Sequence, residues 1–230
     1  MFIGHFGVGL AAKRAAPEVS LGALFAACQL ADLLWPTLVL LGVEQVRIAP
    51  GITRVTPLDF VSYPYSHSLV TLCAYGIALG IACAATSRRP RSARIVAVVA
   101  AVVVSHWILD VVTHRPDVPV VPGGTARLGL GLWNSLAATV IVESAIFFAG
   151  LAIYLRATAG AARRRGVLWS LVALLLIIYV VNLLSPPPPS PSAVAWGAEA
   201  LWLLVAFGWW ADRSRSVDGN PRPESRRVYQ

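Results

Sequence analysis

Residues Ala93 to Val112 read ARIVAVVAAVVVSHWILDVV, a mostly apolar run with a histidine and an aspartate near its end. A helix of this length, rising about 1.5 Å per residue, crosses the roughly 30 Å hydrocarbon core of a bilayer. Five further apolar runs of similar length flank it: Ser20–Leu41, Ser66–Ala85, Leu132–Leu155, Val167–Leu184 and Ala193–Trp210. Because a backbone in hydrocarbon must satisfy its own hydrogen bonds, each run should be a helix. The sequence therefore predicts an all-α polytopic membrane protein with about six transmembrane helices.

The two ends of the chain differ from these runs. Phe2–Ala12 is apolar but too short to cross a bilayer, so we expect a short re-entrant helix packed inside the protein. Lys13 and Arg14 after it should stay at the cytoplasmic surface. Residues 1–211 are expected to form one membrane-embedded domain, and the polar residues 212–230 a disordered cytoplasmic tail.

Charge is scarce and unevenly placed. Of 230 residues, 57% are hydrophobic and 13% charged, about half the charged fraction of soluble domains. The net charge of +8 does not indicate a nucleic-acid partner, because the basic residues lie in short clusters between apolar runs. Residues 13–14, 88–94, 156–165 and 213–227 hold two, four, four and five of the 19 basic residues. The positive-inside rule then places both termini in the cytoplasm.

Several ionisable side chains fall within or beside the apolar runs, where each is costly and therefore suggests a function. These residues are His5, Asp32, His67, His106, Asp110, His114, Glu143 and Glu199. With Asn134, most of them fall in the outer halves of the predicted helices, which suggests one polar chamber open to the outer face. Pro36, close to Asp32, is expected to break the first spanning helix.

The most specific local motif is Ser105-His106-Trp107-Ile108-Leu109-Asp110. His106 and Asp110 are four residues apart and share a helix face, which His114 extends by one more step. Nitrogen and carboxylate ligands on one face suit a zinc-like ion, although a structural pair that caps the helix has the same pattern. Ser66, next to His67, has the properties of a helix N-cap more than of a nucleophile.

These motifs, taken in order, resemble a known family. Gly4-His5, Ala31-Asp32-Leu33-Leu34-Trp35-Pro36, Tyr65-Ser66-His67-Ser68-Leu69, the Ser105–Asp110 motif and Val118-Pro119 resemble motifs of bacterial inner-membrane metal-dependent hydrolases, whose named example is regulated by the LexA repressor. The resemblance extends to about residue 125. That family is distantly similar to zinc-dependent phospholipases C and single-strand nucleases.

The resemblance implies a ligand set of His5, Asp32, His67, His106 and Asp110, with His114 as a further candidate. It implies one or two divalent ions, with zinc the first choice. Leu34 and Ser62-Tyr63 depart from the family motifs, which argues against a three-metal centre.

Two functions remain open at this point. The first is a membrane-embedded metal-dependent hydrolase that acts on a phosphoester or lipid-linked substrate at the outer side, with membrane lipid or a small molecule as its partner. The second is a non-enzymatic permease or ion- or solute-binding membrane protein. A sealed inner half would favour the hydrolase, whereas a polar path to both faces would favour transport. The sequence assigns no catalytic residue and no oligomeric state.

Overall fold

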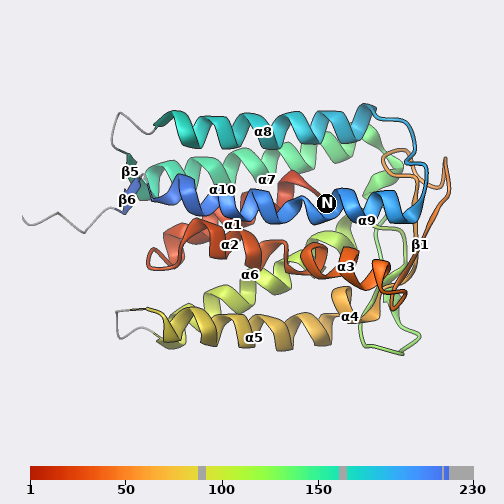
Figure 1. The fold of residues 1–230 in the computed structure, drawn as a ribbon, viewed down its shortest axis with the longest axis horizontal. Coiled ribbons are helices and arrows are strands. Elements are labelled where there is room, and N and C mark those ends of the chain that lie inside the picture. The colour runs from red at the N-terminus through yellow and green to blue at the C-terminus, as the bar shows by residue number, and fades with distance from the viewer. Residues whose placement is uncertain (88–91, 161–164, 214, 218–230) are drawn as a thin grey trace, which may run out of the picture.

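The structure, a computed structural model, describes residues 1–87, 92–160, 165–213 and 215–217 (Figure 1). Helices dominate it: α1 Ile3–Ala15, α2 Leu21–Cys28, α3 Leu30–Leu40, α4 Pro64–His67, α5 Leu69–Ala85, α6 Ser92–Thr113, the 3-10 turn η1 Leu132–Asn134, α7 Leu136–Ala157, α8 Arg165–Leu184, α9 Pro191–Glu199 and α10 Leu201–Asp212. The strands are short and pair antiparallel, β1 Gln45–Ile48 with β2 Leu58–Ser62, β3 Val118–Pro119 with β4 Arg127–Leu128, and β5 Thr158–Gly160 with β6 Arg215–Val217. The all-α prediction is confirmed, with these short strand pairs as additions.

Four helices in the described part of the chain are long and apolar enough to cross a membrane: Ala93–Thr113, Leu136–Ala157, Gly166–Leu184 and Pro191–Asp212. The pair α2 and α3 makes a fifth if the two helices are counted as one bent span. The second predicted run is divided at Ser68, which caps α5 by accepting a hydrogen bond from the Thr71 amide, so α5 has only 17 residues. The structure thus supports four or five spans rather than six.

The first predicted span is broken, but not where the sequence suggested. Between α2 and α3 the chain bends by 58° at Gln29, whereas Pro36 lies inside α3 and the helix continues past it to Leu40. A helix end leaves its last carbonyl groups without helical donors. The Cys28 carbonyl at this bend becomes part of the site described below.

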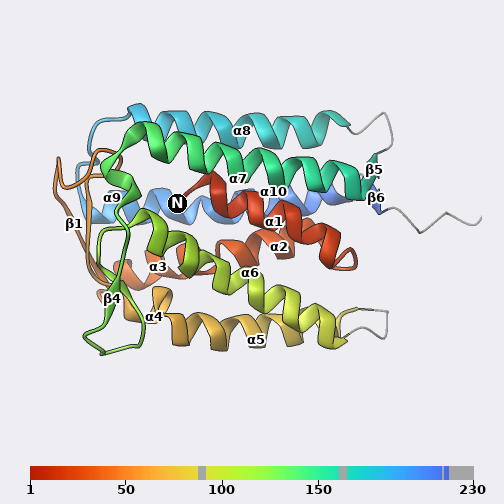
Figure 2. The same cartoon turned by 180° about the vertical axis from the view of Figure 1, so that it is seen from behind.

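Helix α1 is buried inside the bundle, and the N-terminus lies within its outline (Figure 2). Ile3, Phe6 and Leu10 are at most 1% exposed. Gly7 and Gly150 allow α1 and α7 to approach closely, because a Cβ atom on Gly150 would lie 2.0 Å from the Gly7 carbonyl oxygen. The expected short N-terminal helix is therefore present and packed in protein.

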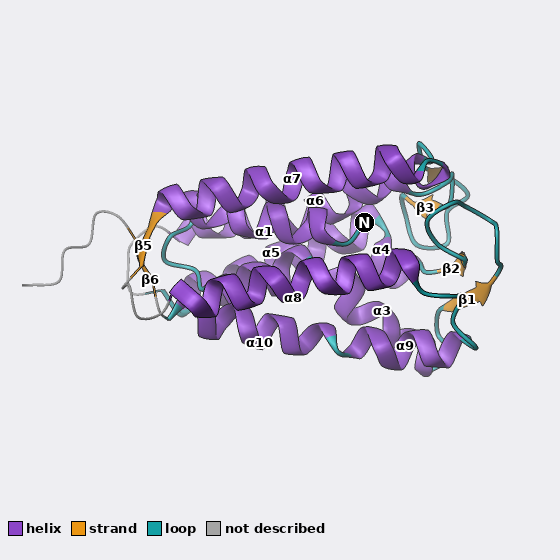
Figure 3. Ribbon diagram, turned by 90° about the horizontal axis from the view of Figure 1, so that it is seen from above, coloured by secondary structure: helices purple, strands orange, loops and turns teal. Residues whose placement is uncertain are grey.

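The connections of the bundle gather at two ends. The turn between α1 and α2, the start of α8 and the end of α10 lie with β5 and β6 at one end, and the β1–β2 hairpin lies at the other (Figures 1 and 2). Helix α8 runs beside α10 (Figure 3). We call these the β5–β6 end and the β1–β2 end.

Lys13 lies at the β5–β6 end but is not at the surface, contrary to expectation. Its ammonium group is buried, 2.8 Å from the Asp212 carboxylate and 2.8 Å from the Val19 carbonyl oxygen. A buried charge requires such a partner. Asp212, predicted to begin the tail, thus ends α10 instead, and residues 214 and 218–230 of the predicted tail lie outside the described residues.

Candidate metal centre

Four side chains from three helices meet in the half of the bundle nearer the β1–β2 hairpin. Asp110 Oδ2 on α6 lies 3.1 Å from His106 Nε2, one turn earlier, and 3.7 Å from His67 Nε2 on α4. Asp32 Oδ1 on α3 lies 3.4 Å from His67 Nε2 and 3.8 Å from His106 Nε2. His67, His106 and Asp110 are at most 3% exposed.

These distances are compatible with a shared metal ion. Ligand atoms about 2.0–2.2 Å from a tetrahedral zinc ion lie roughly 3.3–3.6 Å from one another. The four separations that join the two imidazole nitrogens to the two carboxylate oxygens run from 3.1 to 3.8 Å. The donor set, two imidazoles and two carboxylates, is also one that zinc accepts.

The ring of His106 is held with its ligand atom facing the cluster. Its Nδ1 atom lies 2.7 Å from the Cys28 carbonyl oxygen, which only accepts hydrogen bonds, so Nδ1 carries the proton. The lone pair of a neutral imidazole is then on Nε2. That atom is buried and has no hydrogen-bond partner among the described residues. Metal-binding histidines are oriented in this way by a partner on their other nitrogen.

His67 is oriented by a similar relay. The Ser66 hydroxyl lies 2.6 Å from Glu44 Oε2 and 2.7 Å from His67 Nδ1. Because a carboxylate only accepts, Ser66 donates to Glu44 and accepts from His67, which again leaves the lone pair on Nε2. Glu44 is itself fixed by the amides of Tyr65 and Ser66. Ser66 is therefore not the predicted N-cap, a role that Ser68 fills for α5.

A third histidine, His114, lies at the rim of the cluster and is also held by a partner on its Nδ1 atom. Its Nδ1 atom lies 3.0 Å from Asp117 Oδ1, which also accepts from the Tyr63 hydroxyl at 2.7 Å. Burial and the Asp117 carboxylate raise the pKa of Tyr63 well above its ordinary value, so Tyr63 remains a neutral donor. His114 Nε2 lies 3.9 Å from Asp110 Oδ1.

His5 contacts the other oxygen of the Asp110 carboxylate, Oδ1. His5 Nε2 lies 3.2 Å from Asp110 Oδ1, and its ring stacks on that of His106 with centroids 3.8 Å apart. The Met1 amino group lies 3.0 Å from the same oxygen. Ligand atoms that all lie within 4.8 Å of one another occur in two groups that share His106: His67, His106 and Asp110, and His5, Asp32 and His106.

The remaining predicted chamber residues have different positions. Glu143 on α7 lines the pocket described below, as predicted, and is buried. It accepts hydrogen bonds from the amides of Phe2 and Gly4, so it fixes the start of α1 beside the cluster. Asn134 is exposed in η1 and is not part of the pocket wall. Glu199 accepts a 2.6 Å hydrogen bond from Thr37 and joins α9 to α3 outside the pocket.

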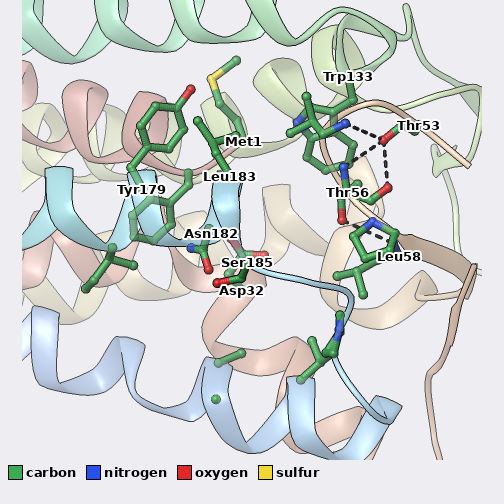
Figure 4. Close-up of a pocket in the computed structure, with 18 of the residues that line it drawn as sticks. Met1, Asp32, Thr53, Thr56, Leu58, Trp133, Tyr179, Asn182, Leu183 and Ser185 are labelled. Carbon is green, nitrogen blue, oxygen red and sulfur yellow. Dashed lines mark hydrogen bonds between the residues drawn. The ribbon is translucent and has the colours of Figure 1, made fainter. Parts of the chain in front are cut away.

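A pocket of about 860 Å³ opens directly onto the cluster. Asp32, His67, Asp110 and His114 lie in its wall. In Figure 4, Met1 and Asp32 lie between Tyr179 and Asn182 of α8 on one side and the loop that carries Thr53 and Thr56 on the other. The volume lies toward the upper end of the range for small-molecule sites, about 300–1,000 Å³.

The fold and cluster thus define a helical protein with membrane-length helices and a buried histidine–carboxylate site. No protein-family model, curated protein or solved structure matches the chain. The residues that orient the histidines, Glu44, Asp117 and the Cys28 carbonyl, were not foreseen from the sequence. Only Asp117 had a local signal, its position three residues after His114.

Proposed function

We propose that this protein is a membrane-embedded, metal-dependent phosphoester hydrolase, whose ion is held by Asp32, His67, His106 and Asp110. The observation that carries the proposal is the convergence of four potential ligand atoms, with both histidines held by a partner on Nδ1. A histidine–carboxylate pair that only stabilises the fold would not need hydrogen bonds that fix both histidines through Nδ1. The sequence resemblance to metal-dependent membrane hydrolases supports the same reaction class.

A zinc ion bound here would lower the pKa of a bound water to about 7 and would stabilise negative charge on the substrate. In hydrolysis, the water oxygen bonds to phosphorus and the P–O bond to the alcohol breaks. The alcohol leaves with one water proton, and the other proton is released to solvent. His106 and His67 would direct the lone pairs on their Nε2 atoms toward the ion. The His5 ring stacks on that of His106 and supports it. His114 lies at the rim of the cluster, near Asp110.

The membrane setting rests on the membrane-length helices. Four or five long spans, with the 17-residue α5 near the lower limit for crossing a bilayer, would place the protein in a bacterial inner membrane. The positive-inside rule would then put the β5–β6 end in the cytoplasm and the pocket on the outer side.

The packing of the β5–β6 end favours a hydrolase over a permease. The pocket residues lie toward the β1–β2 end, whereas Leu21, Leu24 and Phe25 of α2 are fully buried within the apolar core. Lys13 and Asp212 close the same end with a buried ion pair. A permease would need a polar path through this region in some state of its cycle.

The direct test is hydrolysis of a water-soluble phosphodiester, such as bis(p-nitrophenyl) phosphate, by zinc-loaded protein in detergent. We expect turnover that a chelator abolishes and zinc restores, and that His67→Ala removes. Ser105→Ala is the matched control, because within the described residues the Ser105 hydroxyl donates a hydrogen bond only to the Val102 carbonyl of its own helix. Equal turnover by His67→Ala and Ser105→Ala would reject the proposal.

A further inference from the structure

We infer that the substrate of this site is a membrane lipid, with its phosphoester at the Asp110 cluster and its acyl chain along a wall formed by α8, α9 and α10. This inference rests on the proposed function and specifies its substrate class. It is carried by the shape and lining of the pocket, by its opening on spanning helices and by polar atoms in its wall that have no partner.

The pocket is polar at one side and apolar at the other. Its polar side holds the Asp32, His67 and Asp110 side chains, and its apolar side holds Leu174 and Ile178 of α8 with Leu201 and Leu204 of α10. Such a division suits an amphiphile, whereas a wholly water-soluble phosphoester would leave the leucine wall without a partner.

The length of the apolar wall corresponds to one leaflet. Along α8 the lining runs from Leu174 to Ser185, at the helix end. At about 1.5 Å per residue this is roughly 16 Å, close to half of the approximately 30 Å hydrocarbon core. A lipid anchored at the cluster can therefore keep its chain at its ordinary depth.

The wall also reaches the outside of the bundle. Leu203 lines the pocket and is 71% exposed on α10, which is part of the membrane-length span Pro191–Asp212. Gly197 and Ala200, also exposed, line the pocket on the same side. Apart from its chain neighbours and the nearby backbone of its own helix, no described atom lies within 4 Å of where a Gly197 Cβ would be, so the bundle surface is open here. A lipid could move sideways from the bilayer into the pocket without leaving hydrocarbon.

Two polar atoms of residues in the wall are buried without a hydrogen-bond partner. The Tyr179 hydroxyl and the Trp35 indole nitrogen belong to pocket residues that are 6% and 5% exposed, and neither atom has a hydrogen-bond partner in the described structure. Leaving a buried donor unpaired costs free energy, which is recovered if a ligand headgroup reaches it. Arg54 adds a positive charge from the loop between β1 and β2.

The inference is tested by photo-crosslinking in vesicles of phosphatidylglycerol and phosphatidylethanolamine that contain a trace of phospholipid with a diazirine on its acyl chain. The protein is zinc-loaded and the lipid is a phosphonate analogue, whose P–C bond is not hydrolysed, so that binding is measured without turnover. We expect adducts on the pocket residues of α8 and α10. Gly197→Trp, which fills the opening without a backbone clash, should lower these adducts by about tenfold. The matched control is Gly166→Trp, because Gly166 also has open space around its Cβ position but lies outside the pocket, at the start of α8.

Turnover gives the second readout. Gly197→Trp should lose about tenfold activity on long-chain phospholipid but less than about twofold on bis(p-nitrophenyl) phosphate, since only the chain is excluded. Pocket adducts that Gly197→Trp does not reduce, or adducts confined to the outer surface, would overturn the lipid inference even if the soluble diester is hydrolysed. Pocket adducts in a protein that hydrolyses neither substrate would uphold lipid binding and reject the hydrolase instead.

Discussion

The Nδ1 atom of His106 donates a hydrogen bond to the Cys28 carbonyl oxygen across 2.7 Å. Cys28 ends α2 at the point where the chain bends by 58° into α3, the helix that carries Asp32. The break in the first span therefore performs two tasks. It supplies a free carbonyl that fixes one histidine, and it redirects the helix that brings a carboxylate to the same place.

Ser66 and Ser68 provide a matched pair of substitutions. Ser66→Ala removes the hydroxyl that links His67 to Glu44, so zinc affinity should fall about 10–100-fold. The unfolding free energy should fall as well, because Glu44 and His67 each lose a buried hydrogen-bond partner. Ser68→Ala removes the α5 cap, so it should cost about 0.5–2 kcal/mol of unfolding free energy and leave zinc affinity unchanged. Competition with a chromogenic chelator and thermal unfolding in detergent measure the two effects. The same loss of affinity in both variants would show that Ser66 does not position His67.

The Lys13–Asp212 pair is expected to stabilise the β5–β6 end. Lys13→Met leaves the buried Asp212 carboxylate without its partner and should destabilise the protein by about 3–5 kcal/mol. The double variant Lys13→Met/Asp212→Leu should recover part of that loss, because the unpaired charge is gone. Denaturant unfolding of the two single variants and the double variant gives the coupling energy, and strictly additive effects would argue against the pair.

The topology prediction places both the tail and the start of α8 on the cytoplasmic side. Reporter fusions at Gln230 and between Gly123 and Gly124 should therefore report opposite sides of the membrane, because the second site lies in the loop between β3 and β4. If both fusions report the same side of the membrane, the predicted topology, and with it the assignment of the pocket to the outer face, is wrong.

Arg54 is expected to attract anionic substrates. Arg54→Gln should raise KM for a phosphodiester about three- to tenfold with little change in kcat, since an exposed cation contributes mainly to binding. Arg47→Gln is the control, because Arg47 is exposed on β1 but does not line the pocket. Equal KM changes in both variants would indicate a general charge effect rather than a contact.

The sequence predicted the parts of this structure that depend on regular spacing. Long apolar runs predicted helices, and the four-residue spacing of His106 and Asp110 placed both on one face of α6. The bend at Gln29 has no local signal, because no glycine or proline marks it and Pro36 is tolerated within α3. Glu44 lies in a turn just before β1, and its role depends on the later return of the chain to Ser66. Backbone carbonyls such as that of Cys28 leave no mark in a sequence.

Metal content tests the central claim most directly. Zinc-loaded wild type should hold about one zinc ion per chain, and its X-ray absorption spectrum should show nitrogen and oxygen ligands at about 2.0–2.2 Å. His106→Ala should remove the zinc while the protein still elutes as a folded species in detergent, and Ser105→Ala should retain it. A wild-type protein that takes up no zinc after reconstitution, or a His106→Ala variant that binds as much as wild type, would contradict the account.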